Sequence, residues 1–257
     1  EVKACNACPR SPFVMLFPEY FMPRQGVYFN AHDTVSYVIR EMGYTIDYAT
    51  ETRIADGRLD KYKILVMPAA DYISDATYAK VMDFVNRGGT VVVLQSFPLH
   101  DWEGKSRDVS FFESGKKDAV PFDAGGNTIL KYKAGKGQIY YMNIPPSKEK
   151  GITKEAKDSV SQLLEKVIAD NLSVQPVKIR SAFCENRTIF WKEKDRNMQY
   201  LTFVTNENGG ENLVLKPEYL LKVKSCVDLI TGEEMKPDQI KVLPWTARLL
   251  LYEMEKN

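Results

Sequence analysis

Short apolar runs alternate with segments of helical spacing over the first two-thirds of the chain. The apolar runs that predict strands cover residues 13–17, 45–49, 64–67 and 90–94. Between them, residues 35–42 and 78–85 carry apolar side chains at helical spacing, and glycines follow both segments. Continuous apolar strands joined by amphipathic helices are typical of a parallel sheet covered on both faces. The pattern therefore predicts an α/β domain.

Local signals place the start of the helix at 78–85, one further helix and a hairpin. Ser74 is a good N-cap for the helix that covers residues 78–85, and Thr153 is one for a later helix that ends near Asn171. Residues 128–133 and 138–143 flank a Gly-rich turn and predict a β-hairpin. Residues 101–127 are irregular and polar, so we expect loop there with at most short pieces of helix or strand.

The second part of the chain shows no helical period. Seven short strands are predicted, at residues 177–183, 188–192, 199–205, 212–215, 221–229, 239–243 and 247–252. Short strands separated by turn residues are typical of a small antiparallel β-sandwich. The predicted organisation is an N-terminal tail at 1–11, an α/β domain at 12–173 and a β-sandwich at 174–257, with the change of period between Asn171 and Val177.

Charge and composition exclude several classes of partner. The 257 residues carry a net charge of +1, and Lys and Arg are scattered among acids. We therefore expect no nucleic-acid partner. No apolar run approaches the roughly 20 residues of a membrane helix, so we expect no membrane partner. The chain begins with Glu1 rather than Met, and we expect a processed form or a piece of a longer protein. The compartment is undetermined.

No motif predicts a metal or a cofactor. Cys5 and Cys8 have the spacing of a metal or redox pair, but a second pair is missing, because Cys184 and Cys226 stand far apart. We interpret them as structural. The glycines at 135 and 137 lie in the hairpin turn and do not open a helix, so they are not interpreted as a phosphate site.

Residues 62–97, YKILVMPAADYISDATYAKVMDFVNRGGTVVVLQSF, resemble the class I glutamine amidotransferase fold, a flavodoxin-like architecture. In that fold the fourth strand runs into a Gly-x-Cys-x-Gly elbow that presents the nucleophile. Here Gln95 replaces the Cys, while Val93 and Phe97 replace the glycines. His32 and His100 both precede residue 101, whereas the family's catalytic His comes late. We expect neither the elbow nor acyl-transfer chemistry.

Three segments resemble the non-catalytic domains of the family 42 β-galactosidases. LVMPAADYISDATYAKVMDFVNRGGTVVV and AGKGQIYYMNI are similar to the middle, trimerisation domain, and VDLITGEEMKPDQIKVLPWTARLLLYE is similar to the last β-domain. The order agrees, and the resemblance extends from about residue 12 to residue 253. These enzymes hydrolyse galactosides in an N-terminal (β/α)₈ barrel of about 250 residues, which this chain does not include.

The resemblance implies an assembly or support region of a glycoside hydrolase that is not itself catalytic. Its partners would be its own copies, in a trimer, or a catalytic barrel domain. The alternative is a stand-alone protein that binds a carbohydrate or another small ligand with an amidotransferase-like fold. A barrel encoded upstream of Glu1 would favour the first hypothesis.

Candidate site residues follow the predicted strands. The carboxyl ends of strands in an open α/β sheet meet at one edge, where ligands bind. The predicted ligand pocket contains Glu19, Asp71, Gln95 and Ser96. Other acids, such as Asp101 and Glu103, have no spacing that pairs them for glycoside hydrolysis, so no catalytic residue is assigned.

The loop after the fourth strand is unusually apolar. Its predicted interface residues are Phe97, Trp102, Phe111 and Phe112, accompanied by Leu99 and Val109. We expect these groups to be buried against another copy of the chain. Two alternatives remain: the loop folds back on its own sheet, or a barrel covers it. Trp191 and Trp245 lie in or beside strands and are interpreted as sandwich core or its edge rather than sugar platforms.

Overall fold

The computed structural model describes residues 7–8, 11–19, 26–42, 44, 46–143, 153–172, 177–180, 188–193, 199–206, 213–219, 223–237 and 240–255. The chain divides into two compact units. Pro12–Val38 and Ile46–Leu172 form one, here called the α/β unit. Glu1–Ser11, Ile39–Thr45 and Ser173–Asn257 form the other, here called the β unit.

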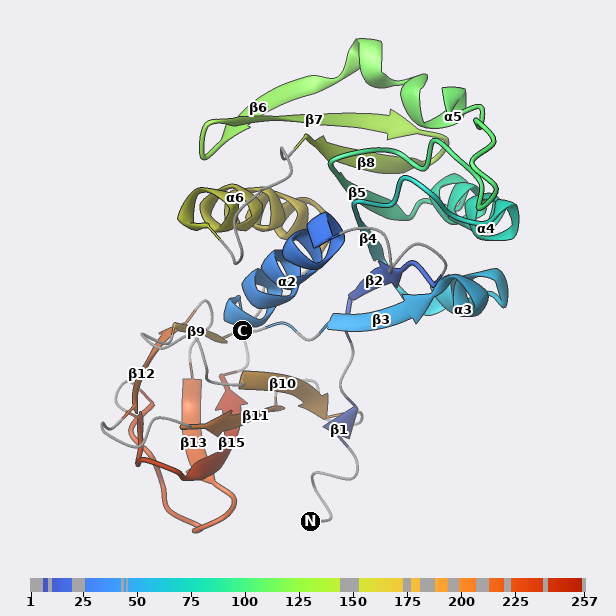
Figure 1. The fold of residues 1–257 in the computed structure, drawn as a ribbon. Helices are drawn as coiled ribbons and strands as arrows, with labels where there is room; N and C mark the ends of the chain where they lie inside the picture. The colour runs from blue at the N-terminus through green and yellow to red at the C-terminus, as the bar shows by residue number, and fades with distance from the viewer. Residues whose placement is uncertain are drawn as a thin grey trace. The chain divides into compact units, whose positions relative to one another are not determined.

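The α/β unit is built on a sheet of seven strands in the order β3-β2-β4-β5-β8-β7-β6 (Figure 1). The strands are β2 (Phe13–Phe17), β3 (Ile46–Thr50), β4 (Ile64–Pro68), β5 (Thr90–Leu94), β6 (Val120–Ala124), β7 (Asn127–Ala134) and β8 (Gly137–Met142). The first five in this order are parallel, and β7 is antiparallel to both β8 and β6. The predicted α/β class and the predicted hairpin are confirmed, although the sheet is mixed at one end.

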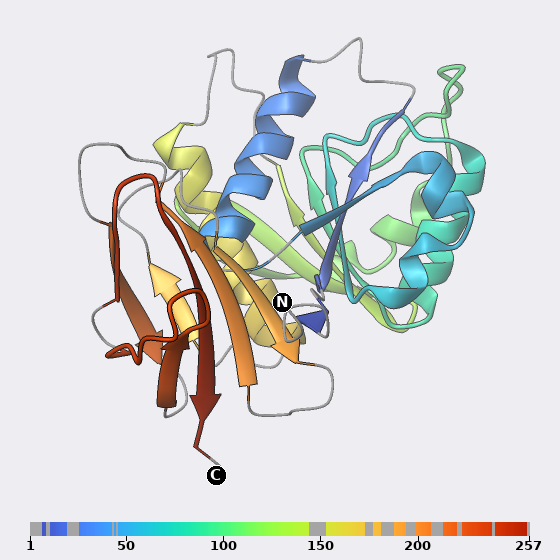
Figure 2. The same cartoon turned by 90° about the horizontal axis from the view of Figure 1, so that it is seen from below.

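Helices cover both faces of this sheet. They are α2 (Gly26–Glu41), α3 (Glu51–Ala55), α4 (Asp75–Asn86), α5 (Ser110–Glu113) and α6 (Lys154–Asn171), with 3₁₀ turns η2 (Arg58–Lys61) and η3 (Lys116–Asp118). Figures 1 and 2 show α2 and α6 on one face and α3 and α4 on the other. Both predicted caps are confirmed: the hydroxyl of Ser74 accepts from the amide of Thr77, and that of Thr153 accepts from the amide of Ala156.

The strands at the centre of the sheet are buried on both faces, whereas the edge strand β6 is exposed. Every residue of β4 and β5 is buried, as their continuous apolar sequences predict for strands covered on both faces. The expectation for 101–127, loop with at most short elements, is confirmed, because α5, η3 and β6 there have four, three and five residues. The hydrophobic pattern does not predict β6, because β6 is an edge strand with an exposed Val120 and contains a proline. This proline, Pro121, pairs with Leu130 of β7.

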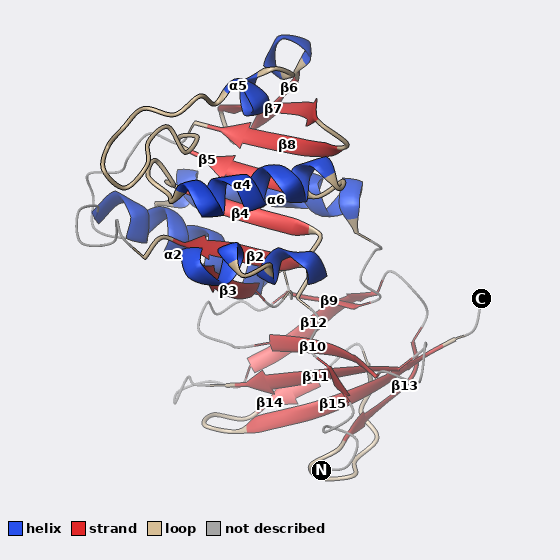
Figure 3. Cartoon of the chain, turned by 90° about the vertical axis from the view of Figure 1, so that its right-hand side faces the viewer, coloured by secondary structure: helices blue, strands red, loops and turns tan. Residues whose placement is uncertain are grey.

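The β unit consists of two antiparallel sheets (Figure 3). One has the order β1-β10-β11-β15-β13 and the other β14-β12-β9. The strands are β1 (Ala7–Cys8), β9 (Val177–Arg180), β10 (Thr188–Glu193), β11 (Gln199–Thr205), β12 (Leu213–Tyr219), β13 (Val223–Asp228), β14 (Ile240–Val242) and β15 (Ala247–Met254). A strand lies in each of the seven predicted segments, whose residues 181–183, 212, 221–222 and 239 lie outside the described part of the chain. β1, from the predicted tail, pairs with β10.

A buried cluster joins the two sheets of the β unit. It includes Val204 of β11 and Leu250 of β15 from the larger sheet, and Ile240 and Val242 of β14 from the smaller one. The two sheets therefore share one core. Cys5 and Cys184 lie outside the described residues.

The turn between β14 and β15 places a tryptophan in an uncommon conformation. The amide of Thr246 donates to the carbonyl of Leu243 at 3.2 Å, Pro244 follows Leu243, and Trp245 has a φ of 56°. This is the pattern of a type II turn, in which glycine is favoured at the position of Trp245. The side chain is 74% exposed, which excludes the sandwich core and leaves the other predicted position, the edge of the sandwich. The side chain of Trp191 lies outside the described part of the chain.

Candidate functional site at the carboxyl edge of the sheet

The topology of the α/β unit brings the predicted pocket residues to one edge. From β2 the chain passes to β3 on one side, and then returns to β4 on the other side. Ligands in open α/β sheets bind at such a reversal, outside the carboxyl ends of the strands. Glu19 follows β2, Asp71 follows β4, and Gln95 and Ser96 follow β5.

Glu19 fastens the end of β2 to the beginning of α3. Its Oε2 accepts from the backbone amide of Thr52 at 2.9 Å and from the hydroxyl of Thr52 at 2.7 Å. Burial opposes ionisation of this carboxyl most strongly, but the hydrogen bonds from Thr52 and Thr50 together outweigh it and lower the pKa of Glu19. Glu19 is therefore an ionised group that already serves as a structural acceptor.

Glu51, the first residue of α3, is a buried carboxyl that the sequence did not reveal. It is 1% exposed. Its Oε2 accepts from the backbone amide of Ser74 at 2.6 Å. Burial raises the pKa of Glu51, and the charge of Glu19 adds to this rise, whereas hydrogen bonds from Ser74 and from the backbone of Glu19 act against it. The only sequence signal was a Thr-Glu pair directly after a strand, because the five-residue helix is too short to show a period.

Asp71 is joined to the loop after β5 through the backbone. The amide of His100 donates to the carbonyl of Asp71 at 3.0 Å, and the rings of Tyr72 and His100 stack with centroids 4.8 Å apart. The loops that follow β4 and β5 are thus held against each other, as the prediction of a common edge requires.

Gln95 occupies the position of the amidotransferase nucleophile and has a strained backbone. Its φ is 74°, and the amide of Ser96 donates to the carbonyl of Leu94 at 3.1 Å. This is a γ-turn with a positive φ at its central residue, the rarer and strained form. The positive φ at the position of the nucleophile is thus adopted by Gln95 itself, without glycines at Val93 and Phe97.

The chain after this γ-turn differs from a nucleophile elbow. No helix begins there: the chain continues as a loop with isolated bridges until α5 starts at Ser110. The backbone amide of Gln95 donates to the backbone carbonyl of Met142 at 2.9 Å, and the backbone carbonyl of Gln95 accepts from the hydroxyl of Tyr141 at 3.0 Å. Without a helix N-terminus at this point, the turn offers no dipole to stabilise an anionic nucleophile.

A cavity of about 530 Å³ lies at this edge, beside α3, α4 and the loop after β5. Its lining consists of Glu51, Thr52, Ala55, Asp56, Ser74, Asp75, Ala76, Asp101, Trp102 and Glu103. None of the four predicted pocket residues belongs to this lining. The sequence places Asp101 and Glu103 near the edge and Trp102 in the same loop, but only the fold brings them together with Glu51 and Asp75.

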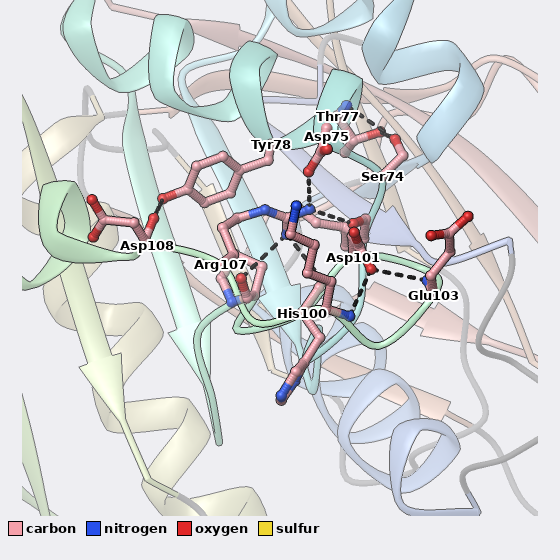
Figure 4. Close-up of polar contacts among 12 residues, drawn as sticks. Ser74, Asp75, Thr77, Tyr78, His100, Asp101, Glu103, Arg107 and Asp108 are labelled. Carbon is pink, nitrogen blue, oxygen red and sulfur yellow. Dashed lines mark hydrogen bonds and ion pairs between the residues drawn. The ribbon is translucent and has the colours of Figure 1, made fainter.

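Arg107 holds the wall of this cavity in place (Figure 4). Its guanidinium donates to the carbonyls of Ile73, Pro98 and His100 and forms an ion pair with Asp75 at 2.6 Å. Only 8% of the Arg107 side chain is exposed. The loop that carries Trp102 is therefore clamped to the segment between β4 and α4.

The predicted interface residues separate into two groups. Phe97 and Phe112 are buried in the core of the unit, and the Phe97 ring stacks on that of Tyr141 with centroids 4.9 Å apart. The alternative in which the loop folds back on its own sheet accounts for these two. Phe111 packs partly buried against the same core, and Trp102 is 51% exposed.

Other classes of site find no support in the described part of the chain. No group of three or more His, Cys, Asp or Glu side chains there could hold a metal ion. Among the same residues, no helix is both long enough and apolar enough to cross a bilayer.

Comparison with known proteins gives a match of fold alone. No protein-family model matches the sequence, and no curated protein matches it. Among solved structures, the GH42 β-galactosidase Gan42B of G. stearothermophilus matches with a TM-score of 0.67 at 14% identity, over 95% of this chain and 40% of the enzyme. The whole chain resembles part of a family 42 glycoside hydrolase.

Two further structures agree. The β-galactosidase of Bacillus circulans sp. alkalophilus matches with a TM-score of 0.68 at 13% identity, over 96% of this chain and 42% of that one. The exo-carrageenase GH42 of Bacteroides ovatus matches with a TM-score of 0.66 at 15% identity, over 96% of this chain and 29% of that one. The chain thus spans less than half the length of these enzymes.

Proposed function

We propose that this chain is the assembly and support region of a β-galactosidase-like glycoside hydrolase. It would combine an amidotransferase-like α/β domain with a β-sandwich domain. The observation that carries the proposal is the extent of the fold match: 95% of this chain superposes on only 40% of a GH42 β-galactosidase. A support region beside a separate catalytic barrel would match the enzyme in this way, over nearly all of its own length but less than half of the enzyme.

The chemistry of the carboxyl edge supports a role other than hydrolysis. Retaining hydrolysis needs two carboxylates about 5 Å apart that both reach the sugar. Glu19 is occupied by the amide and hydroxyl of Thr52, and Glu51 is buried with one oxygen on the amide of Ser74. These two carboxyls hold segments together. In this proposal, hydrolysis belongs to a (β/α)₈ barrel of about 250 residues.

The proposal includes self-association, in line with the trimerisation domain that the sequence resembles. Of the four predicted interface residues, the core takes up Phe97 and Phe112, which leaves Trp102 and Phe111. Sedimentation equilibrium at micromolar concentration tests the assembly, and a nitrophenyl galactoside tests the activity. The expected result is a trimer without hydrolysis. Galactoside hydrolysis by the chain alone would overturn the support role.

A second candidate function is that of a carbohydrate- or small-ligand-binding protein. The cavity of about 530 Å³ favours it, because its volume suits a small molecule and Trp102 lines it half-exposed. The two candidates predict different behaviour in solution: the support region forms a trimer, whereas the second function needs only a monomer that binds a ligand. A monomeric chain that takes up a small ligand would favour this second function over the first.

A further inference from the structure

The short helix α3 buries little apolar surface. Of its five side chains only Glu51 and Ile54 are buried, and only Ile54 of these two is apolar. A segment with few buried apolar groups belongs to the least stable part of a fold and opens locally before the rest unfolds. The polar contacts of α3 therefore decide how firmly it is held.

Two carboxyl groups tie α3 to the segments beside it. Glu19, after β2, accepts from the backbone N–H and the hydroxyl of Thr52 at 2.9 and 2.7 Å. The carboxyl of Glu51 accepts from the backbone N–H of Ser74 at 2.6 Å, and the carbonyl of Glu51 accepts from the hydroxyl of Thr77 at 3.1 Å. One carboxyl thus connects α3 to the end of β2, and the other connects it to the beginning of α4.

The charge that acts on Glu51 has the same sign as its own. Burial raises the pKa of Glu51, and the negative charge of Glu19 adds to this rise. From α4, the backbone N–H of Ser74 and the hydroxyl of Thr77 face Glu51, and both are neutral groups. A buried carboxylate beside a second carboxylate destabilises the arrangement that buries it.

In the described part of the chain, the other charged groups near Glu51 give it no partner. Arg53, the cation of α3, is exposed and lies two positions further along the helix, where side chains do not face each other. Arg107, in the loop after β5, is paired with Asp75 of α4. The remaining charged residues that line the cavity beside α3 are the acids Asp56, Asp101 and Glu103.

We propose that Glu51 and Glu19 form a pH-sensitive latch, which holds α3 against α4 and releases it as the pH rises. Loss of the Glu51 proton brings a second negative charge beside Glu19, and opening of α3 transfers the buried charge to water. Thr52, Ala55 and Asp56 line the cavity of about 530 Å³, so release of α3 removes one wall of this cavity. The latch is independent of the support role proposed above.

The two carboxyls lose their hold on α3 in opposite directions of pH. The folded-state pKa of Glu51 lies above 4.5, so its contribution is complete below the open-state pKa and is lost as the pH rises through the folded-state pKa. The folded-state pKa of Glu19 lies below 4.5, so its contribution is complete above the open-state pKa and is lost as the pH falls through the folded-state pKa. α3 should therefore be held most firmly near the ordinary pKa of a glutamate.

Amide hydrogen exchange of the full chain between about pH 4.5 and pH 8 tests the latch. The reporters are the amides of Asp56 and Gly57, which donate to the carbonyls of Thr52 and Ile54 at 3.0 and 2.9 Å and are released when α3 opens. Their protection factors, corrected for the intrinsic exchange rate at each pH, should fall at least about threefold and by no more than about tenfold per pH unit. Constant protection over this range would overturn the proposal.

The urea dependence of the same exchange separates local opening from global unfolding. Release of a five-residue helix exposes little surface, so the exchange of Asp56 and Gly57 should respond weakly to urea. A response as steep as that of the equilibrium unfolding of the chain would assign the exchange to global unfolding and contradict a latch.

Matched variants assign the effect to the two carboxyls. Glu51→Gln keeps an acceptor oxygen for the Ser74 amide but does not titrate, so protection should change less than about twofold over the range. Glu155→Gln, at an exposed glutamate in the first turn of α6, is the control and should keep the wild-type pH dependence. A fall of wild-type size in Glu51→Gln would refute the role of Glu51.

The part played by Glu19 is tested separately. Glu19→Gln removes the negative charge that raises the pKa of Glu51, so the fall in protection should end at a lower pH than in the wild type. Titration of the Glu51 carboxyl by ¹³C NMR in both proteins measures this shift directly. Identical Glu51 titration curves in the wild type and Glu19→Gln would show that the two carboxyls do not act as a pair.

Discussion

The carboxylate of Glu51 accepts a hydrogen bond of 2.6 Å from the backbone N–H of Ser74. The bond joins the first residue of α3 to the N-cap of α4, and the hydroxyl of Thr77 adds a second link by donating to the carbonyl of Glu51 at 3.1 Å. Two helices that follow different strands are thereby fixed at one wall of the cavity. The shape of the cavity depends on this buried carboxyl.

The stability of the chain should fall with rising pH because of Glu51. Burial raises its pKa above the ordinary value of 4.5, so the native state holds the proton more tightly than the unfolded chain. Its contribution is complete below the unfolded pKa and is lost as pH rises through the folded pKa. Glu51→Gln stays neutral and should flatten the urea-unfolding profile between about pH 4 and pH 8. Profiles of equal slope would contradict this account.

Removal of the same side chain should be costly. Glu51→Ala leaves the amide of Ser74 without its acceptor, and a buried unsatisfied amide costs about 1–3 kcal/mol. Chemical denaturation of Glu51→Ala and Glu51→Gln at one pH measures the difference. A loss of equal size in both variants would contradict this account, because glutamine keeps an acceptor oxygen for the Ser74 amide.

Gln95→Gly should stabilise the chain by about 1 kcal/mol, because glycine adopts a φ of 74° without steric cost. Ser96→Gly is the matched control. Ser96 is not among the residues with positive φ, so this change should destabilise the chain slightly. Thermal unfolding compares the two, and a loss of stability in Gln95→Gly would show that the Gln95 side chain makes a larger contribution than its strain.

Gln95→Cys should not produce glutaminase activity. The γ-turn already has the positive φ, but no helix follows it directly to stabilise a thiolate. The sequence also lacks a late histidine, since His32 and His100 both precede residue 101. Release of ammonia from glutamine by this variant would refute the prediction.

Arg107→Met should cost about 3 kcal/mol, because three backbone carbonyls and Asp75 lose a charged donor. Arg107→Lys should restore little of this, since one ammonium cannot reach acceptors arranged for a planar guanidinium. Limited proteolysis should then cut the loop between β5 and α5. A loop that stays resistant in both variants would exclude the clamp.

The sequence predicted those elements whose residues repeat a clear signal. β4 and β5 are continuous apolar runs because both faces of each strand are buried. Ser74 and Thr153 are typical N-cap residues and mark the starts of α4 and α6. The elements that escaped are short or exposed. α3 has five residues, and β6 carries a proline and faces solvent, so neither has a period to detect.

The candidate site was harder to predict, because its residues become neighbours only through topology. Glu19, Asp71, Gln95 and Ser96 were found from strand ends alone, and each lies at that edge. Glu51 was missed because a glutamate after a strand is usually exposed, and its burial depends on Ser74, 23 residues further along the chain. The turn at Trp245 could not be predicted from the sequence, because a tryptophan stands at the position of positive φ where glycine is the usual signal.

Pro121 gives β6 a property that affects how chains meet. β6 is the last strand of its sheet, Pro121 has no N–H to offer a further strand, and Asp123 puts an exposed charge two positions along. A second copy of the chain at this edge would meet a row of backbone N–H donors that is interrupted at Pro121, beside the negative charge of Asp123. Fibrillar growth by continued strand addition is therefore disfavoured at this end of the sheet.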